Sequence, residues 1–237
     1  MNLPAMRPPA SVSLARCSAR TTHAMNPDTR RPSLHVTALS LGAGAAARLS
    51  GWSAICPAGL SLIVDEEGDL KTGLLRVLAG ETAADAGTVR WIDADNRAWP
   101  PAQYKDALFW RDPRAPWPEV SPAHWAQDLA ARHPRWSAAD WQAHGQGLGL
   151  TEHLHKEMFR LSAGSRRKVL LAVALARGAP LTLIDEPEAA LDWASIRYLR
   201  AALADEAARS AKAGRVIVVA HHEPMPGVPW AQVLRLP

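Results

Sequence analysis

Short apolar runs alternate with stretches of helical periodicity along this chain, and turns rich in glycine and proline separate them. The apolar runs predict strands at 34–41, 52–56, 60–64, 87–93, 107–110, 181–184, 215–220 and 231–236. The helical spacing predicts helices at 74–79, within 122–160, from 166 to a stop at Gly178, and from 193 to about 213. Strands that alternate with helices indicate an α/β fold whose core is a mainly parallel sheet.

One predicted strand ends on two adjacent carboxylates, Asp185 and Glu186. In open α/β sheets the carboxyl ends of the strands form the edge where ligands bind. There, one carboxylate can hold Mg²⁺ while its neighbour takes a proton from an attacking water. Taken alone, the pair is more often an ordinary acidic turn, so the interpretation depends on the motifs around it.

The segment from Leu161 to Asp192 supplies those motifs. It reads LSAGS, then a helix, then the strand and acids LTLIDEP, then Leu191-Asp192. In this order and spacing it resembles the signature motif, Walker B strand and D-loop of an ATP-binding cassette (ABC) ATPase. The resemblance covers roughly 34–237. It implies a P-loop NTPase fold of ABC type, with a small antiparallel β part and a helical subdomain at about 113–165.

The resemblance also implies roles for individual residues. Asp185 would hold Mg²⁺, Glu186 would polarise the attacking water, and Ser162 and Gly164 would cap the γ-phosphate of ATP bound by the opposite subunit. Asp192 would join the nucleotide contacts through the D-loop, so the cassettes would pair as a homodimer or heterodimer. The switch histidine that contacts the γ-phosphate aligns with His222, with His221 as the alternative.

The phosphate-binding loop departs from the family pattern. The strand at 60–64, the pair Lys71-Thr72 and the helix that follows are the context that a P-loop requires. The pattern G-x-x-x-x-G-K-[ST] needs glycine where this chain has Asp65 and Leu70. The nucleotide contacts expected in this loop come from Gly68, Asp69, Leu70, Lys71, Thr72 and Gly73, and Thr72 also reaches Mg²⁺. The alternative is that Lys71-Thr72 merely begins a helix.

These departures have physical consequences for nucleotide binding. A leucine forced into a backbone conformation that suits glycine would cost about 1–3 kcal/mol. The acids at 65–67 and 69 would place negative charge beside a polyphosphate. Weakened or lost nucleotide binding is therefore one expectation from this loop.

Arg111 stands where family members carry the glutamine of the Q-loop. An arginine cannot coordinate a cation, but it can contact phosphate directly. Its other interpretation is a solvated surface side chain. Nearby lie five of the ten tryptophans (Trp110, Trp117, Trp125, Trp136 and Trp141), for which packing between elements is the favoured interpretation.

Composition limits the remaining choices. The chain has 237 residues and a net charge of +4, and its first 34 residues hold five arginines and a single acid, Asp28. The excess positive charge is therefore in the leading segment, and a nucleic-acid partner is not expected. Segment 1–33 is interpreted as a disordered basic extension. A targeting peptide is the alternative, and Met25 is a second candidate start. Cys17 and Cys56 show neither metal spacing nor a disulfide framework.

The leading hypothesis is the ATP-binding subunit of an ABC transporter, which hydrolyses ATP to drive transport through a separate permease. No apolar run approaches the ~20 residues of a membrane span, so we expect a cytoplasmic protein held at the inner face of the membrane by that permease. One alternative is a degenerate, hydrolysis-impaired cassette with a structural or regulatory role. Another is an ABC protein that acts on nucleic acid. The start of the signature motif and the run GTVRW also resemble the haem-exporter ATPase of cytochrome c maturation.

Overall fold

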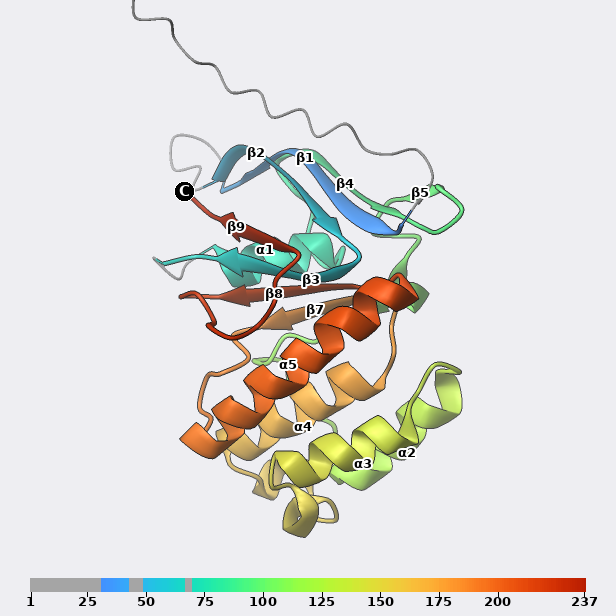
Figure 1. The fold of residues 1–237 in the computed structure, drawn as a ribbon, viewed down its shortest axis with the longest axis vertical. Helices are drawn as coiled ribbons and strands as arrows, with labels where there is room; N and C mark the ends of the chain where they lie inside the picture. The colour runs from blue at the N-terminus through green and yellow to red at the C-terminus, as the bar shows by residue number, and fades with distance from the viewer. Residues whose placement is uncertain (1–30, 43–48, 67–69) are drawn as a thin grey trace, which may run out of the picture.

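The computed structural model describes residues 31–42, 49–66 and 70–237 (Figure 1). Residues 1–30 of the predicted basic extension therefore lie outside the described residues, and its last residue, Ser33, begins the first strand. One sheet is antiparallel, with strand order β2-β1-β4-β5. Its strands are β1 (Ser33–Leu41), β2 (Leu49–Pro57), β4 (Ala86–Ile92) and β5 (Ala98–Trp99).

The second sheet is parallel throughout and has the order β6-β7-β8-β3-β9. It consists of β3 (Gly59–Val64), β6 (Leu108–Phe109), β7 (Leu181–Asp185), β8 (Val216–His221) and β9 (Gln232–Arg235). Every residue of β3, β7 and β8 is buried, as expected for strands covered on both faces. Asp185 pairs with Ala220 and Val64 pairs with His221, so the three central strands end level with one another.

Helices cover both faces of the parallel sheet (Figure 1). Helix α1 (Lys71–Leu78) lies between the two sheets, where Leu74 and Leu78 share an apolar cluster with Leu34 and Leu183. Helices α4 (Ala163–Ala176) and α5 (Trp193–Ala213) contribute to the cluster on the other face of the parallel sheet. The apolar residues of the strands alternate between these two clusters because successive side chains point to opposite faces.

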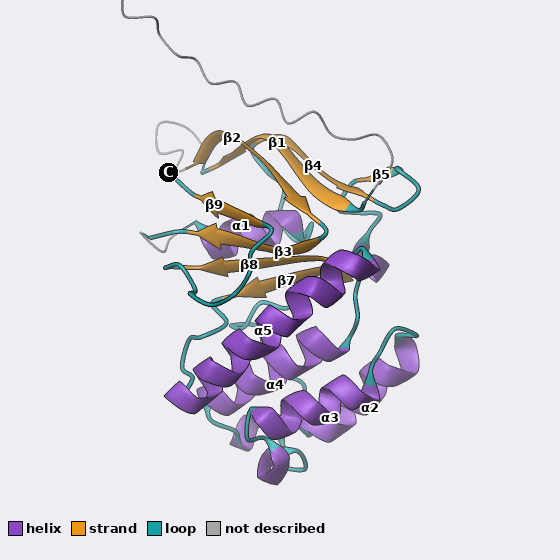
Figure 2. Cartoon of the chain, in the orientation of Figure 1, coloured by secondary structure: helices purple, strands orange, loops and turns teal. Residues whose placement is uncertain are grey.

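The remaining helices lie beyond α4 at one end of the molecule, as Figure 2 shows. They are α2 (Pro122–Arg132), α3 (Ala138–Gly147) and the short 3₁₀ turns Thr151–His153 and Met158–Arg160; a further 3₁₀ turn, Lys105–Ala107, precedes β6. Trp117 and Trp125 meet edge to face with ring centroids 6.1 Å apart, and Trp136 and Trp141 meet at 5.9 Å. These four indoles pack against the apolar core, which agrees with the predicted packing role of the tryptophans.

The predicted fold class is confirmed, with two local differences. Helix α1 begins at Lys71 rather than Leu74, so Lys71, Thr72 and Gly73 form its first turn. Strand β5 was not predicted because two residues are too few to show a period. In the described part of the chain, no helix is both long and apolar enough to cross a membrane.

Candidate functional site

Three neighbouring strand ends bring the predicted catalytic residues together. Asp185 ends β7 and Glu186 follows it, His222 follows β8, and α1 begins at Lys71 a few residues after β3. Because β7, β8 and β3 are adjacent in the sheet, these residues meet at its carboxyl edge.

Thr72 and Asp185 form one contact across this edge. The Thr72 hydroxyl donates a hydrogen bond of 2.7 Å to Oδ2 of Asp185. The other carboxylate oxygen, Oδ1, is buried and has no hydrogen-bond partner among the described residues. Burial raises the pKa of the Asp185 carboxyl, and the bond from Thr72 offsets only part of that effect. A buried carboxylate oxygen without a donor, beside a hydroxyl, suits a hard cation such as Mg²⁺.

Glu186 is held from two sides. Its Oε1 lies 2.9 Å from Nζ of Lys71, and its Oε2 lies 3.0 Å from Nδ1 of His222. Burial raises the pKa of the Glu186 carboxyl, but the bonds from Lys71 and His222 outweigh burial and leave the pKa below its usual range. Glu186 is therefore a carboxylate at neutral pH. Its φ of 44° is in the left-handed region, which is uncommon for a residue with a side chain.

The two candidate switch histidines differ in exposure. His221 is buried, and its Nε2 lies 3.5 Å from Oε2 of Glu186, whereas the side chain of His222 is 54% exposed and makes the shorter contact. Both histidines could join Glu186 in holding a metal ion, since one ligand atom from each residue lies within 4.8 Å of the others. The Lys71 ammonium on the same carboxylate disfavours a dication there.

Asp65 occupies an unexpected position. It is 2% exposed, and its Oδ2 accepts hydrogen bonds from the backbone N–H groups of Leu70 at 2.8 Å and Lys71 at 3.0 Å. Leu70 has φ −97° and ψ −33°, an ordinary right-handed conformation. The strain expected at Leu70 is therefore absent, because the chain enters α1 without a glycine-like turn there. The predicted contacts Gly68 and Asp69 lie outside the described residues.

The signature residues begin helix α4. Ser162 caps the helix by accepting the N–H of Ser165 at 3.0 Å. Gly164 lies against the loop before α5, and a Cβ added there would be 2.5 Å from the carbonyl oxygen of Ala190. Glycine is thus required at position 164 for this close approach.

Asp192 caps α5 and is bound by Lys168 of α4. It accepts the N–H of Ser195 at 2.8 Å, and its Oδ2 lies 2.6 Å from Nζ of Lys168. The hydrogen bond from Lys168 is the main cause that lowers the pKa of the Asp192 carboxyl. Asp192 therefore has a structural role in joining two helices, and its predicted contact with nucleotide stays a prediction.

Arg111 contacts aromatic rings. Its guanidinium lies 4.7 Å from the ring centroid of Trp117 and 5.8 Å from that of Trp125, and it donates to the Pro116 carbonyl. It is therefore more than a solvated surface side chain, and a contact with phosphate stays a prediction.

Gly73 is exposed in the first turn of α1, and a Cβ added there would have nothing within 4 Å. Its predicted contact with nucleotide stays a prediction.

Sequence reasoning missed two residues that support the site. Arg167 donates a 2.7 Å hydrogen bond from Nη1 to the carbonyl oxygen of Asp185, and thereby ties α4 to the end of β7. Asp112 is buried and pairs with Arg76, which ties α1 to the segment after β6. The basic run 166–168 was visible in the sequence, but which of its members points inward depends on how α4 packs.

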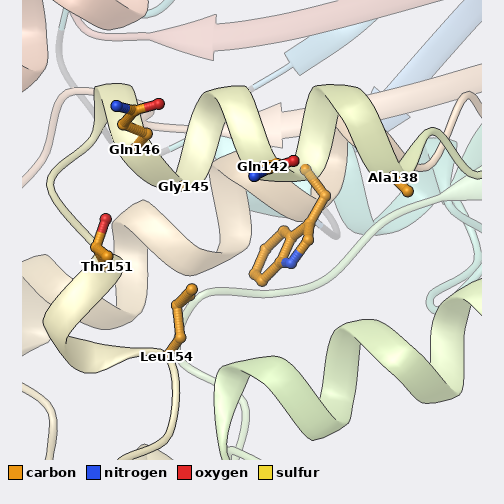
Figure 3. Close-up of a pocket in the computed structure, with 7 residues that line it drawn as sticks. Ala138, Gln142, Gly145, Gln146, Thr151 and Leu154 are labelled. Carbon is orange, nitrogen blue, oxygen red and sulfur yellow. The ribbon is translucent and has the colours of Figure 1, made fainter.

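A separate cavity of about 500 Å³ lies between α3 and the turn at Thr151–His153 (Figure 3). Its lining residues are Ala138, Trp141, Gln142, Gly145, Gln146, Thr151 and Leu154, none of which is an acid, a base or a nucleophilic thiol. This cavity therefore has no part in the chemistry at the sheet edge.

The fold and this edge define a P-loop ATPase subunit. The family model described as "ABC transporter" matches residues 60–189, more than half of the chain. The chain belongs to the ABC transporter family and is an ATP-binding subunit, an ATPase that works with a membrane permease.

Two kinds of relative support this assignment. The cytochrome c biogenesis ATP-binding export protein CcmA of Cupriavidus necator is 34% identical over 77% of this chain and 78% of its own length. The Yersinia pestis protein of the same name is 33% identical over 71% of this chain and 76% of its own length. The aliphatic sulfonates import protein SsuB of Cupriavidus necator is 35% identical over 58% of this chain and 44% of its own length.

Solved structures show the same fold. An ATP-binding protein of a putative ABC transporter from Pyrococcus furiosus has a TM-score of 0.69 at 17% identity, covering 86% of this chain and 97% of that one. A bacterial Atm1-family exporter with ATP bound has a TM-score of 0.66 at 19% identity, covering 88% of this chain and 37% of that one.

Proposed function

We propose that this chain binds ATP with Mg²⁺ at the carboxyl edge of the parallel sheet and hydrolyses it to drive export through a separate permease. The observation that carries the proposal is the convergence of Lys71, Thr72, Asp185, Glu186 and His222 at three adjacent strand ends. Each lies within hydrogen-bond distance of another member of the group.

Thr72 and Asp185 are the proposed Mg²⁺ ligands. The Thr72 hydroxyl already donates to Oδ2 of Asp185, and Oδ1 has no donor within the described part of the chain, so a cation would satisfy a buried polar atom. When bound, Mg²⁺ neutralises charge on the β- and γ-phosphates. Lys71, in the first turn of α1, is the proposed ligand of the outer phosphates.

Glu186 is the proposed group that orients and deprotonates the attacking water. It is ionised at neutral pH, as a general base must be, and His222 holds one of its oxygens. The 54% exposure of the His222 side chain leaves it able to contact a γ-phosphate, so we assign His222 rather than His221 as the switch histidine.

The complete site would need two copies of the cassette. Ser162 and Gly164 stand at the start of α4, where Ser162 accepts the N–H of Ser165 and Gly164 approaches the loop before α5; neither of these contacts reaches Lys71 or Glu186. The N-terminus of α4 presents a positive dipole end to an anion. We therefore propose a head-to-tail dimer, in which this helix end faces ATP bound to the partner.

The permease is proposed to bind a surface hollow in the helical part. A cavity of about 740 Å³ is lined by the segment Pro113–Glu119 together with Glu157, Phe159 and Arg166. Phe159 is 70% exposed, which is unusual for a large apolar side chain and marks a surface suited to a protein partner. Attachment through this hollow would place the protein at the inner face of the membrane.

The proposed cargo system is that of cytochrome c biogenesis, with haem as the exported molecule. The support is the pair of export proteins described above, which match over most of their own length, together with the resemblance of the signature motif. The sulfonate importer matches less than half of its length.

The test is ATP binding and hydrolysis by the purified protein. We expect Glu186→Gln to retain ATP binding and to lose hydrolysis by at least about 10²-fold, because the general base is removed while the phosphate ligands remain. Glu152→Gln, an exposed acid in the turn at Thr151–His153, is the matched control and should hydrolyse at the parental rate. Hydrolysis at the parental rate in Glu186→Gln would contradict the assigned role.

A further inference from the structure

The first turn of α1 already binds an anion that belongs to the chain. The Asp65 carboxylate accepts the amide groups of Leu70 and Lys71 through one oxygen, at 2.8 and 3.0 Å. Leu70, the N-cap residue, supplies no side-chain capping bond of its own. Asp65 therefore caps the helix from five positions upstream, and at 2% exposure its carboxylate is shielded from water.

Amide groups at a helix start are the donors with which a P-loop holds phosphate. The family pattern has glycine where this chain has Asp65, and glycine brings no side chain to those donors. A carboxylate oxygen and a phosphate oxygen accept the same hydrogen bonds, and both are negative. They cannot share the two amides, so a bound phosphate requires the Asp65 side chain to leave.

The lysine of the same loop is also bound by an internal acid. Its Nζ lies 2.9 Å from Oε1 of Glu186, and its side chain is 6% exposed. Both kinds of phosphate donor, the backbone amides and the ammonium, thus have a carboxylate as partner in this structure. ATP would have to replace two internal anions.

We propose that Asp65 is a built-in competitor for the phosphate groups of ATP and sets the nucleotide affinity of this subunit low. The inference rests on the proposed function, since it concerns ATP at the same site. It also explains how an acid is retained at a glycine position: in the absence of nucleotide the carboxylate stabilises the start of α1, and with nucleotide it opposes binding.

Calorimetric titration of the full chain with ATP and Mg²⁺ tests this proposal. We expect Asp65→Ala to lower the Kd for ATP by at least about tenfold, equivalent to about 1.4 kcal/mol. Without nucleotide the same variant should unfold about 2–4 °C lower, because two amides lose their acceptor. Asp65→Asn keeps an acceptor without the charge, so it should have near-parental thermal stability and an intermediate Kd.

Glu66→Ala is the matched control, since Glu66 is the next acid in the chain but is exposed and pairs with Arg235. Its Kd should stay within about twofold of the parental value. If the parent binds ATP and both Asp65 variants bind it equally or more weakly, the inference fails and the proposed function stands. If neither the parent nor either Asp65 variant binds ATP, both fail.

Discussion

The two adjacent carboxylates at the end of β7, Asp185 in the strand and Glu186 just after it, have pKa values shifted in opposite directions. The buried Asp185 carboxylate accepts one side-chain hydrogen bond, from the hydroxyl of Thr72. The Glu186 carboxylate contacts two side chains, the ammonium of Lys71 and the imidazole of His222. Burial therefore dominates for Asp185 and raises its pKa, and the donors dominate for Glu186 and lower its pKa. Such opposed environments are typical of sites where neighbouring acids have different roles.

Asp185→Asn should stabilise the protein at neutral pH in the absence of Mg²⁺. The raised pKa means that the folded state favours the protonated acid, so the stability from Asp185 is present below its ordinary pKa of 3.8 and is lost as the pH rises through the folded-state value. The variant should therefore resist urea better than the parent at pH 7.5, with a difference that vanishes below about pH 4.

Asp205→Asn, at an exposed position on α5, is the control for this measurement and should change the free energy of unfolding by less than about 0.5 kcal/mol at pH 7.5. A less stable Asp185→Asn at pH 7.5 would show that Lys71 and Arg167 stabilise the charge by more than burial disfavours it.

At the level of elements, α4 and the loop before α5 approach each other closely beside the signature motif. Gly164 makes this approach, and the bond between Lys168 and Asp192 joins the same two elements at the next turn of α4. The residues of the signature motif and D-loop are therefore parts of one local packing arrangement, so a change in either should affect the other.

Gly164→Ala should destabilise the protein by about 1–3 kcal/mol, because its methyl group would lie 2.5 Å from the Ala190 carbonyl oxygen and force the loop to move. Gly145→Ala in α3 is the matched control, since nothing lies within 4 Å of its added Cβ. The control should be about 0.5–1 kcal/mol more stable than the parent through the helix preference of alanine. Thermal unfolding of both variants measures the difference, and equal effects would contradict the close approach.

At the scale of the whole molecule, the chemistry and the proposed docking surface are on different parts of the chain. The sheet edge holds the acids and histidines, while the hollow around Phe159 involves the segment after β6 and the turn before α4. Arg167 and Arg111 belong to the segments between them, at α4 and after β6. A permease bound at the hollow could therefore influence the sheet edge through elements that contact both.

Phe159→Asp should remove coupling to the permease without loss of fold. In liposomes with the permease of a cytochrome c biogenesis exporter, we expect the parent to show stimulated ATP hydrolysis and the variant to show none. Because Phe159 is 70% exposed, the thermal midpoint should change by less than about 2 °C. Stimulation of the parent by a sulfonate-importer permease instead would contradict the proposed cargo system.

The family and the order of elements follow from local patterns along the sequence. The spacing of LSAGS, LTLIDEP and Leu191-Asp192 and the alternation of apolar runs are local patterns, and the predicted strands and long helices are present. The loop before α1 shows the limit of such patterns. The departure from consensus was visible in the sequence, but the ordinary conformation of Leu70 and the contact of Asp65 with the first amides of α1 were not.

Which side chains meet in the site depends on how distant elements pack together. Thr72 and Asp185 are 113 positions apart, and their contact depends on α1 packing against the parallel sheet. The choice of His222 over His221 depends on burial, because His221 is the buried last residue of β8 whereas His222 follows the strand and is exposed. Arg111 lies on Trp117 and Trp125 because the segment after β6 folds back on α2. Helices and strands follow from the periodicity of neighbouring residues, whereas the site forms from residues far apart in the sequence that packing brings together.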